Sequence, residues 1–223
     1  MAIGLRISEQ RRAAEDGLIA RASRLPVANI GDVMNRMQAM RGGFLCYGGR
    51  KTIVGHALTV KARQGDNLFL HRAIDLARPG DVIVCDGAGD MVNALAGDLM
   101  IGHAVSRGVG ALVIDGAVRD IAQLRDMDIG VWARGTTPGG PWKDGPGEIG
   151  YPVACGGQVV MTDDLIAADE DGIVVIPSAA AAEVIAAAEA HAAKENETTA
   201  AIAKGGWDRS WVTKTLAEKG LGS

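Results

Sequence analysis

The chain has 223 residues, of which 48% are hydrophobic and only 4% aromatic, with 31 glycines and a net charge of −4. A length of this order suits a single domain (residues 1–223) whose core is built from Ala, Val, Ile, Leu and Met. The acidic balance excludes the basic surface that non-specific nucleic-acid binding requires, so nucleic acid is not an expected partner.

The sequence also favours a cytoplasmic protein without a membrane partner. No apolar stretch reaches the length that spans a bilayer, and the charged N-terminus lacks the apolar core of a signal peptide. Cys46, Cys85 and Cys155 lie far apart and are odd in number, which favours reduced, mostly buried thiols.

In chain order, residues 1–45 are expected to form a helical N-terminal segment with a turn at Pro26. The stretch Lys51–Lys61 is rich in β-branched residues and predicts a strand. Residues 66–77 carry apolar side chains at helical spacing, and the Pro79-Gly80 pair ends that helix.

The middle of the chain alternates between two kinds of pattern. Short apolar runs at 81–86, 111–115 and 130–133 predict buried strands, and the stretches 97–107 and 117–127 between them predict helices. Strands that alternate with helices in this way predict right-handed βαβ units. The expected fold class is therefore α/β, a single domain with a central, largely parallel sheet.

The last third of the chain begins with a Gly- and Pro-rich stretch, 136–151, which predicts a long and functional loop. Residues 151–160 and 172–176 predict strands. An Ala-rich helix capped by Ser178 is expected to run to about residue 204, followed by a helical tail, 205–223. Trp207 and Trp211 in that tail indicate docking, so the C-terminal helices (178–223) are expected at a subunit interface.

Three polar residues stand out by their spacing. Asp98 begins the helix after one predicted strand. Arg119 and Asp120 follow the next strand, with twenty residues between Asp98 and Arg119. Adjacent parallel strands deliver all three to the same sheet edge, where open α/β sheets bind their ligands. The same pattern also suits solvated helix ends stabilised by the helix dipole, so spacing alone leaves both interpretations open.

The residue types suit an anionic ligand and a hard metal ion. Backbone amides of Gly97, Asp98, Leu99 and Met100 at a helix N-terminus predict a site for a carboxylate or enolate oxygen. Arg119 is suited to holding a carboxylate. The carboxylates of Asp98 and Asp120 are oxygen donors of the kind that Mg²⁺ or Mn²⁺ prefers, and the sequence has no zinc-type His/Cys spacing.

Several motifs resemble one family over about residues 25–200: GDNL (65–68), ARPGDVIVCDG (77–87), GDLM (97–100), GALVIDGAVRD (110–120) and ADEDGIVVIP (168–177). This family is the 4-hydroxy-4-methyl-2-oxoglutarate / 4-carboxy-4-hydroxy-2-oxoadipate aldolases, which are similar to the regulator of ribonuclease E activity A. Within that superfamily, an Asp followed after twenty residues by Arg-Asp distinguishes the aldolases from the regulator. Asp98, Arg119 and Asp120 satisfy this pattern.

The resemblance implies a class II pyruvate aldolase, a carbon–carbon lyase of aromatic-compound degradation that uses Mg²⁺ or Mn²⁺. It would release pyruvate and a keto acid from a 4-hydroxy-2-oxo acid, with oxaloacetate decarboxylation as a side activity. Asp120 would bind the metal directly, and Asp98 through a metal-bound water. Arg119 and residues 97–100 would bind the pyruvyl group. The resemblance also implies a homotrimer or homohexamer, in which Glu195 of a neighbouring subunit approaches the metal through water.

Other expectations concern the rest of the site. Asn67 and His71 share a helix face, and the resemblance implies that this face approaches the substrate. Asp32 is either a site residue or a helix cap, His103 is expected to pack rather than bind, and Lys143 either meets a substrate carboxylate or is solvated. Residues 161–164 and loop 136–150 depart from the family pattern, which leaves the distal half of the substrate open.

The competing function is that of a catalytically silent protein that binds and regulates an RNA-processing enzyme. A methyltransferase is rejected, because no Gly-rich motif with an acidic partner follows the first strand. An intact Asp98, Arg119 and Asp120 set favours the enzyme, since a pure regulator needs no metal site.

Overall fold

The computed structural model of the protein describes residues 2–11, 16–41 and 43–221. The strands are β1 (Leu5–Ile7), β2 (Leu45–Cys46), β3 (Ile53–Ala62), β4 (Val82–Ala96), β5 (Ala111–Val118), β6 (Gly130–Thr136), β7 (Gly147–Ile149), β8 (Val153–Cys155), β9 (Gln158–Val160), β10 (Leu165–Ala168) and β11 (Ile173–Ile176). The helices are α1 (Asp16–Ala22), α2 (Val27–Val33), α3 (Leu68–Leu76), α4 (Asp98–Ser106), α5 (Ile121–Leu124), α6 (Ala181–Ala203) and α7 (Ser210–Glu218), with a 3₁₀ turn at Ser178–Ala180.

The strands form a nine-stranded sheet in the order β1-β7-β3-β4-β5-β6-β2, to which β10 and β11 are added at β3. The central strands β3, β4, β5 and β6 are all parallel. Antiparallel neighbours occur toward the edges, where β7 and β10 pair with β3 and β2 pairs with β6. This arrangement confirms the expected α/β class with a largely parallel central sheet.

Alternating side chains of the central strands fill two cores. Ile83 and Cys85 of β4 belong to the core under α3 and α4, whereas Val82 and Val84 face the core shared with β8, β9, β10 and β11. Because successive side chains of a strand point to opposite faces, each central strand contributes side chains to both cores. A third core joins α1, α2 and the start of α6 to β10 and β11.

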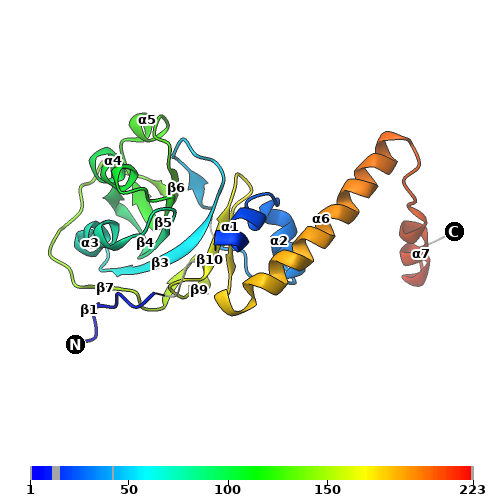
Figure 1. The fold of residues 1–223 in the computed structure, drawn as a ribbon. Helices are drawn as coiled ribbons and strands as arrows, with labels where there is room; N and C mark the ends of the chain where they lie inside the picture. The colour runs from blue at the N-terminus through cyan, green and yellow to red at the C-terminus, as the bar shows by residue number, and fades with distance from the viewer. Residues whose placement is uncertain (1, 12–15, 42, 222–223) are drawn as a thin grey trace.

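The C-terminal helices project away from this body (Figure 1). Of the 23 residues of α6, only Ala181, Ile185 and Ala188, all in its first third, are buried. No residue of α7 is buried, and Trp207 and Trp211 are 43% and 58% exposed. The expected docking of the two Trp side chains therefore does not occur on the described part of this chain.

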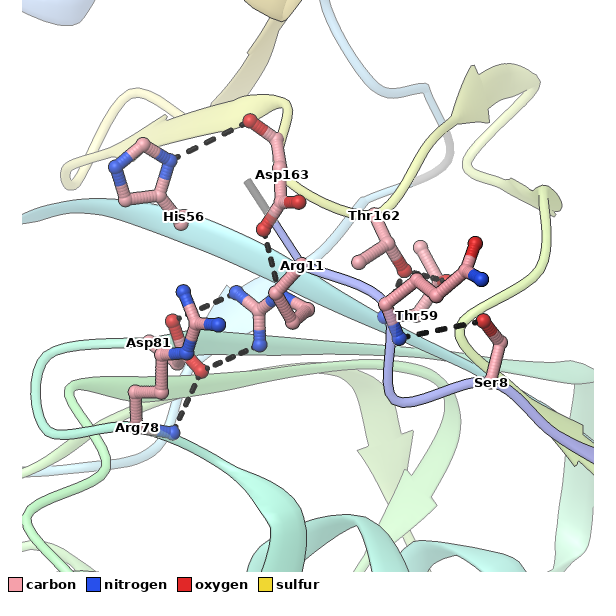
Figure 2. Close-up of polar contacts among 9 residues, drawn as sticks. Ser8, Arg11, His56, Thr59, Arg78, Asp81, Thr162 and Asp163 are labelled. Carbon is pink, nitrogen blue, oxygen red and sulfur yellow. Dashed lines mark hydrogen bonds and ion pairs between the residues drawn. The ribbon is translucent and has the colours of Figure 1, made fainter. Parts of the chain in front are cut away.

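The N-terminal segment is only partly helical, so the expectation for residues 1–45 is wrong in detail. Its first residues form β1, which pairs with β7, and its last form β2 at the far edge of the sheet. Figure 2 shows why the segment stays extended: Arg11 reaches between Asp81 and Asp163. Its guanidinium lies 2.9 Å from an Asp81 oxygen and 2.5 Å from an Asp163 oxygen, and all three side chains are buried.

The strands on either side of the expected site are longer than the apolar runs indicate. Strand β4 continues from 82 to 96 through register shifts at 86–90 and 90–94, and positive φ angles at Ala88 and Gly89 allow this path. Strand β5 continues to Val118, which pairs with Ala96. The helix expected over 117–127 is therefore wrong at its start, and α5 covers only four residues.

Besides β1 and β2, two further strands are not predicted by the sequence, because their patterns are short. Strand β7 lies inside the stretch expected to be a loop, and β10 is a four-residue apolar run. Helix α6 follows the 3₁₀ turn at 178–180 and has Ala180 rather than Ser178 in its cap position. Within the described ranges, no helix combines the length and the apolar composition that crossing a membrane requires.

Candidate functional site

Asp98, Arg119 and Asp120 meet where β4 and β5 end, as their spacing predicts. The Asp98 amide donates to Asp120 Oδ2 at 3.1 Å, and Arg119 Nε lies 3.4 Å from the same oxygen. The Arg119 amide donates to the Ala96 carbonyl, which continues the β4–β5 ladder into the site. Asp120 takes a left-handed conformation (φ 62°). This conformation is uncommon for residues other than glycine, and Asn and Asp adopt it more readily than most.

Gly97 lets these side chains come together. A Cβ at this position would lie 2.3 Å from Asp120 Oδ2, closer than atoms can approach, and 3.0 Å from Arg119 Cγ, a tight contact. The glycine is therefore required by contact with the site and not by its backbone angles, since its φ of −146° is ordinary extended backbone.

The N-terminus of α4 differs from the expectation of four free amides. The Asp98 amide is engaged by Asp120, and the Leu99 amide donates to Asp98 Oδ1 at 2.7 Å. An incoming carboxylate therefore either uses the amides of Gly97 and Met100 or replaces these bonds. Leu99 itself points outward, with 86% of its surface exposed.

A pocket of about 170 Å³ opens beside the cluster. Its lining includes the expected substrate-binding residues Asn67, His71, Gly97, Asp98, Leu99, Met100 and Arg119, together with Ala94, Ala96, Pro141 and Lys143. On the other side of Arg119 lies a more open hollow of about 340 Å³, which Asp120 and Thr136–Pro138 line. Arg119 thus borders both spaces, whereas Asp120 faces the second.

Asn67 carries an unsatisfied acceptor. The side chain is 4% exposed, and its Nδ2 donates to the Leu95 carbonyl at 2.9 Å. Its Oδ1 is buried and has no hydrogen-bond partner among the described residues. A buried acceptor without a partner costs about 1–3 kcal/mol. Because Asn67 belongs to the pocket lining, its amide group suits a ligand that donates a hydrogen bond.

His71 and Lys143 add opposite kinds of polarity to the pocket. Burial, and after it the positive charge of Lys143, lowers the pKa of His71, so the imidazole is neutral at neutral pH. The sequence leaves Lys143 either in contact with a substrate carboxylate or solvated. The structure places it in the lining of the pocket, with its side chain at the solvent-exposed rim.

The remaining candidates lie elsewhere in this chain. Glu195 on α6 accepts a hydrogen bond from Asn29 at 2.8 Å and lies 3.4 Å from His191. Asp32 pairs with Arg36 at 2.7 Å and is neither a helix cap nor beside Asp98. His103 contacts Asp75 at 3.2 Å on the surface of α4. Within one chain, none of them joins the pocket.

The donors of the cluster fit a hard divalent cation. Asp120 places a carboxylate oxygen against the Asp98 amide, where Gly97 leaves room for it, and Asp98 adds a second carboxylate at the start of α4. Throughout the described ranges, no three His, Cys, Asp or Glu side chains gather as a metal-binding group. Mg²⁺ and Mn²⁺ are compatible with this small set, because Mg²⁺ in particular keeps several waters and often binds through one or two carboxylates.

Comparison with known proteins identifies the class to which this fold and site belong. Residues 27–175 match the model of the RraA-like family, described as Aldolase/RraA. Over 156 residues the chain is 36% identical to the "Putative 4-hydroxy-4-methyl-2-oxoglutarate aldolase" of Halalkalibacterium halodurans, covering 70% of this chain and 74% of that protein. The chain belongs to the RraA-like aldolase family.

Two solved structures share the fold but carry different descriptions. Streptomyces coelicolor RraAS2, described as an unusual member of the RNase ES inhibitor RraA family, is 26% identical with a TM-score of 0.75, covering 85% of this chain and 98% of its own. A Geobacillus kaustophilus protein described as an S-adenosylmethionine: 2-dimethylmenaquinone methyltransferase is 33% identical with a TM-score of 0.65, covering 69% and 95%. Because one fold carries three described activities, the function has to be argued from the site.

Proposed function

We propose that the protein is a divalent-metal-dependent lyase that releases pyruvate from 4-hydroxy-2-oxo acids such as 4-hydroxy-4-methyl-2-oxoglutarate or 4-carboxy-4-hydroxy-2-oxoadipate. The observation that carries the proposal is the meeting of Asp98, Arg119 and Asp120 beside a pocket. The similarity to the Halalkalibacterium halodurans protein supports the same activity. A silent regulator has no use for an arginine and an aspartate paired beside the start of α4, at the edge of a pocket.

Each residue has a proposed role. Arg119 binds the carboxylate or keto oxygen of the pyruvyl group, because its guanidinium borders the pocket and offers paired donors. Asn67 Oδ1, which lacks a partner, accepts a hydrogen bond from the 4-hydroxyl group of the substrate. Lys143 at the rim pairs with the distal carboxylate.

The reaction breaks the C3–C4 bond. The 4-hydroxyl group loses its proton to solvent in the pocket and becomes a keto group, while the electron pair of the broken bond stays on C3 as the pyruvate enolate. Protonation of C3 then gives pyruvate. Asp98 and Asp120 would hold Mg²⁺ or Mn²⁺, which when bound polarises the 2-keto oxygen and stabilises negative charge there. Oxaloacetate decarboxylation passes through the same enolate and is the proposed side activity.

The experiment is a pyruvate-release assay with the purified protein. We expect turnover of 4-hydroxy-4-methyl-2-oxoglutarate and of oxaloacetate with Mg²⁺ or Mn²⁺, and its loss on addition of a chelator. Absence of turnover with both substrates and both metals would overturn the proposal.

The alternative function is a regulator that binds an RNA-processing enzyme, which the likeness to Streptomyces coelicolor RraAS2 over 85% of this chain favours. The same assay separates the two functions, because a regulator of this kind would bind its partner without releasing pyruvate.

We also propose that the protein is a homotrimer or homohexamer with α6 and α7 at the interface. In such an assembly Glu195 of one subunit would lie near the metal of its neighbour. The exposed Trp207 and Trp211, and the projection of α6 from the body, support this assembly (Figure 1).

A further inference from the structure

The segment between β6 and β7 carries Pro141 and Lys143 into the pocket lining, and it is fastened by one buried carboxylate. Asp66 is 1% exposed, and its Oδ2 accepts the amides of Asp144 and Gly145 at 2.7 and 2.9 Å. These two amides follow Lys143 directly. Asp66 therefore controls the backbone from which the Lys143 side chain extends.

The same carboxylate fixes the other wall of the pocket. Asp66 Oδ1 accepts the Leu68 amide at 2.9 Å, which sets the first turn of α3 immediately after Asn67. Two backbone hydrogen bonds join the two walls. The Asn67 amide donates to the Trp142 carbonyl at 3.0 Å, and the Trp142 amide donates to the Gly65 carbonyl at 2.8 Å. Lys143 and Asn67 are thus held relative to each other by groups around Asp66.

A carboxylate is the side chain that this place requires. Three backbone N–H groups converge on it, and charge-assisted hydrogen bonds of this kind are about twice as strong as neutral ones. In the described part of the chain, Asp66 has no ion pair, so these amides compensate its charge. An Asn side chain has one acceptor oxygen and would turn its N–H₂ toward one set of amides.

We propose that Asp66 is a positioning residue that holds Lys143 where it can recognise the distal carboxylate of a 2-oxo diacid. This inference rests on the proposed function and adds to it the residue that sets specificity for diacids. Asp66 itself faces backbone amides of the chain and not the pocket, so its effect passes through Lys143 and Asn67.

The kinetic test compares Asp66→Asn with a matched control. Asp144→Asn removes the same charge one residue from Lys143, but the Asp144 side chain is exposed and does not hold this segment to any other described residue. With Asp66→Asn we expect KM for 4-hydroxy-4-methyl-2-oxoglutarate and oxaloacetate to rise about tenfold, as for a lost contact to a charged group, with a smaller change in kcat. KM for 4-hydroxy-2-oxopentanoate, which keeps the 4-hydroxyl group but has no distal carboxylate, should rise much less than KM for the diacids, and Asp144→Asn should behave like the wild type.

A double-mutant cycle links the effect to the lysine. Lys143→Met should raise KM for the diacids to the same degree, and adding Asp66→Asn to it should cause little further change. Additive effects of the two substitutions, or an equal loss of kcat for all three substrates, would overturn the proposal, because either result indicates a general structural role.

Two measurements decide the question without activity. Amide hydrogen exchange at residues 144 and 145 should accelerate in Asp66→Asn and not in Asp144→Asn. By NMR titration, the pKa of His71 should rise toward about 6.5 both in Lys143→Met and in Asp66→Asn, because Lys143 lowers that pKa in the wild type. Unchanged amide exchange together with an unchanged His71 pKa would refute the positioning role of Asp66. An inactive wild type would count against the proposed function alone, because neither measurement needs turnover.

A milder variant covers the case in which Asp66→Asn does not fold. The exposed Arg63 donates from Nη1 to the Gly145 carbonyl at 3.1 Å and fastens the same segment from outside. Arg63→Met should raise KM for the diacids in the same direction by a smaller factor, and no change would contradict the proposal.

Discussion

At the residue scale, the site depends on the absence of a Cβ atom at position 97. Asp120 Oδ2 occupies the space where a side chain at position 97 would begin, and Arg119 Cγ lies beside it. The closeness of the carboxylate, the guanidinium and the start of α4 therefore depends on a glycine at the junction of β4 and α4.

Gly97→Ala tests this dependence. The added methyl group must displace Asp120 or Arg119, and displacement of reacting groups by about 1 Å costs on the order of 100-fold in rate. We expect a loss of pyruvate release of that size while the thermal unfolding midpoint changes little. Gly102→Ala is the matched control. Gly102 lies on the same helix, α4, and a Cβ there would have no atom within 4 Å apart from its chain neighbours and the backbone of its own helix. Equal activity in the two variants would show that the cluster tolerates rearrangement.

Individual residues were predictable to different degrees. Asp98, Arg119 and Asp120 were found because strand ends are marked by apolar runs, and the runs place them on one edge. For Lys143 the sequence leaves a substrate contact and solvation both open, because it lies in a stretch without periodicity. Asp66 has no predicted role, because it acts through backbone amides. The Gly-Asp-Asn-Leu run at 65–68 is the only sequence signal for this wall of the pocket. It points to Asn67 as a site residue and gives no separate indication for Asp66.

At the element scale, the central strands followed their sequence closely and the connections did not. The buried runs in β4 and β5 are continuous and apolar, as strands covered on both faces are. Their extensions carry Gly, Asp and Asn and are held by pairing with each other, which a local pattern does not reveal. Helix α5 is short for the same reason, since β5 retains Ala117 and Val118.

The N-terminal segment is held by side-chain charges more than by periodicity. Arg11 is buried between Asp81 and Asp163 (Figure 2). Its contacts fasten the chain after β1 to the turn before β4, which leaves this stretch extended where a helix was expected.

Arg11→Met should therefore destabilise the fold. Removing the cation leaves two buried carboxylates without their guanidinium, and breaking a buried ion pair in this way costs about 3–5 kcal/mol. Urea denaturation measures this loss as a decrease in the free energy of unfolding. Arg36→Met is the control, because its ion pair with Asp32 is exposed on the Arg side and is expected to contribute at most about 0.5 kcal/mol. Similar losses in both variants would contradict the account of the Arg11 contacts.

At the scale of the whole molecule, the projecting α6 and α7 and the separate position of Glu195 favour an assembly. Glu195 is held by Asn29 on the same chain, so it is ordered without contacting the pocket of its own subunit. In the proposed oligomer it meets the site of a neighbour.

Glu195→Ala tests this arrangement. Loss of a carboxylate that acts through water should weaken Mn²⁺ binding by about 10-fold, the lower end of the range for outer-shell partners of a metal. Calorimetry measures the affinity, and sedimentation should show an unchanged oligomer. Glu197→Ala, an exposed neighbour on the same helix, should leave the affinity unchanged. An unchanged affinity in both variants would remove Glu195 from the site.

The central claim is that Asp98, Arg119 and Asp120 form a metal-dependent lyase site, and metal-stimulated pyruvate release by Asp120→Ala tests it most directly. The substitution removes the proposed metal ligand, whereas Asp126→Ala removes an exposed carboxylate just beyond α5. The account predicts that Asp120→Ala keeps its fold and loses stimulation by Mg²⁺ and Mn²⁺, with Asp126→Ala like the wild type. Wild-type turnover and metal response in Asp120→Ala would contradict it.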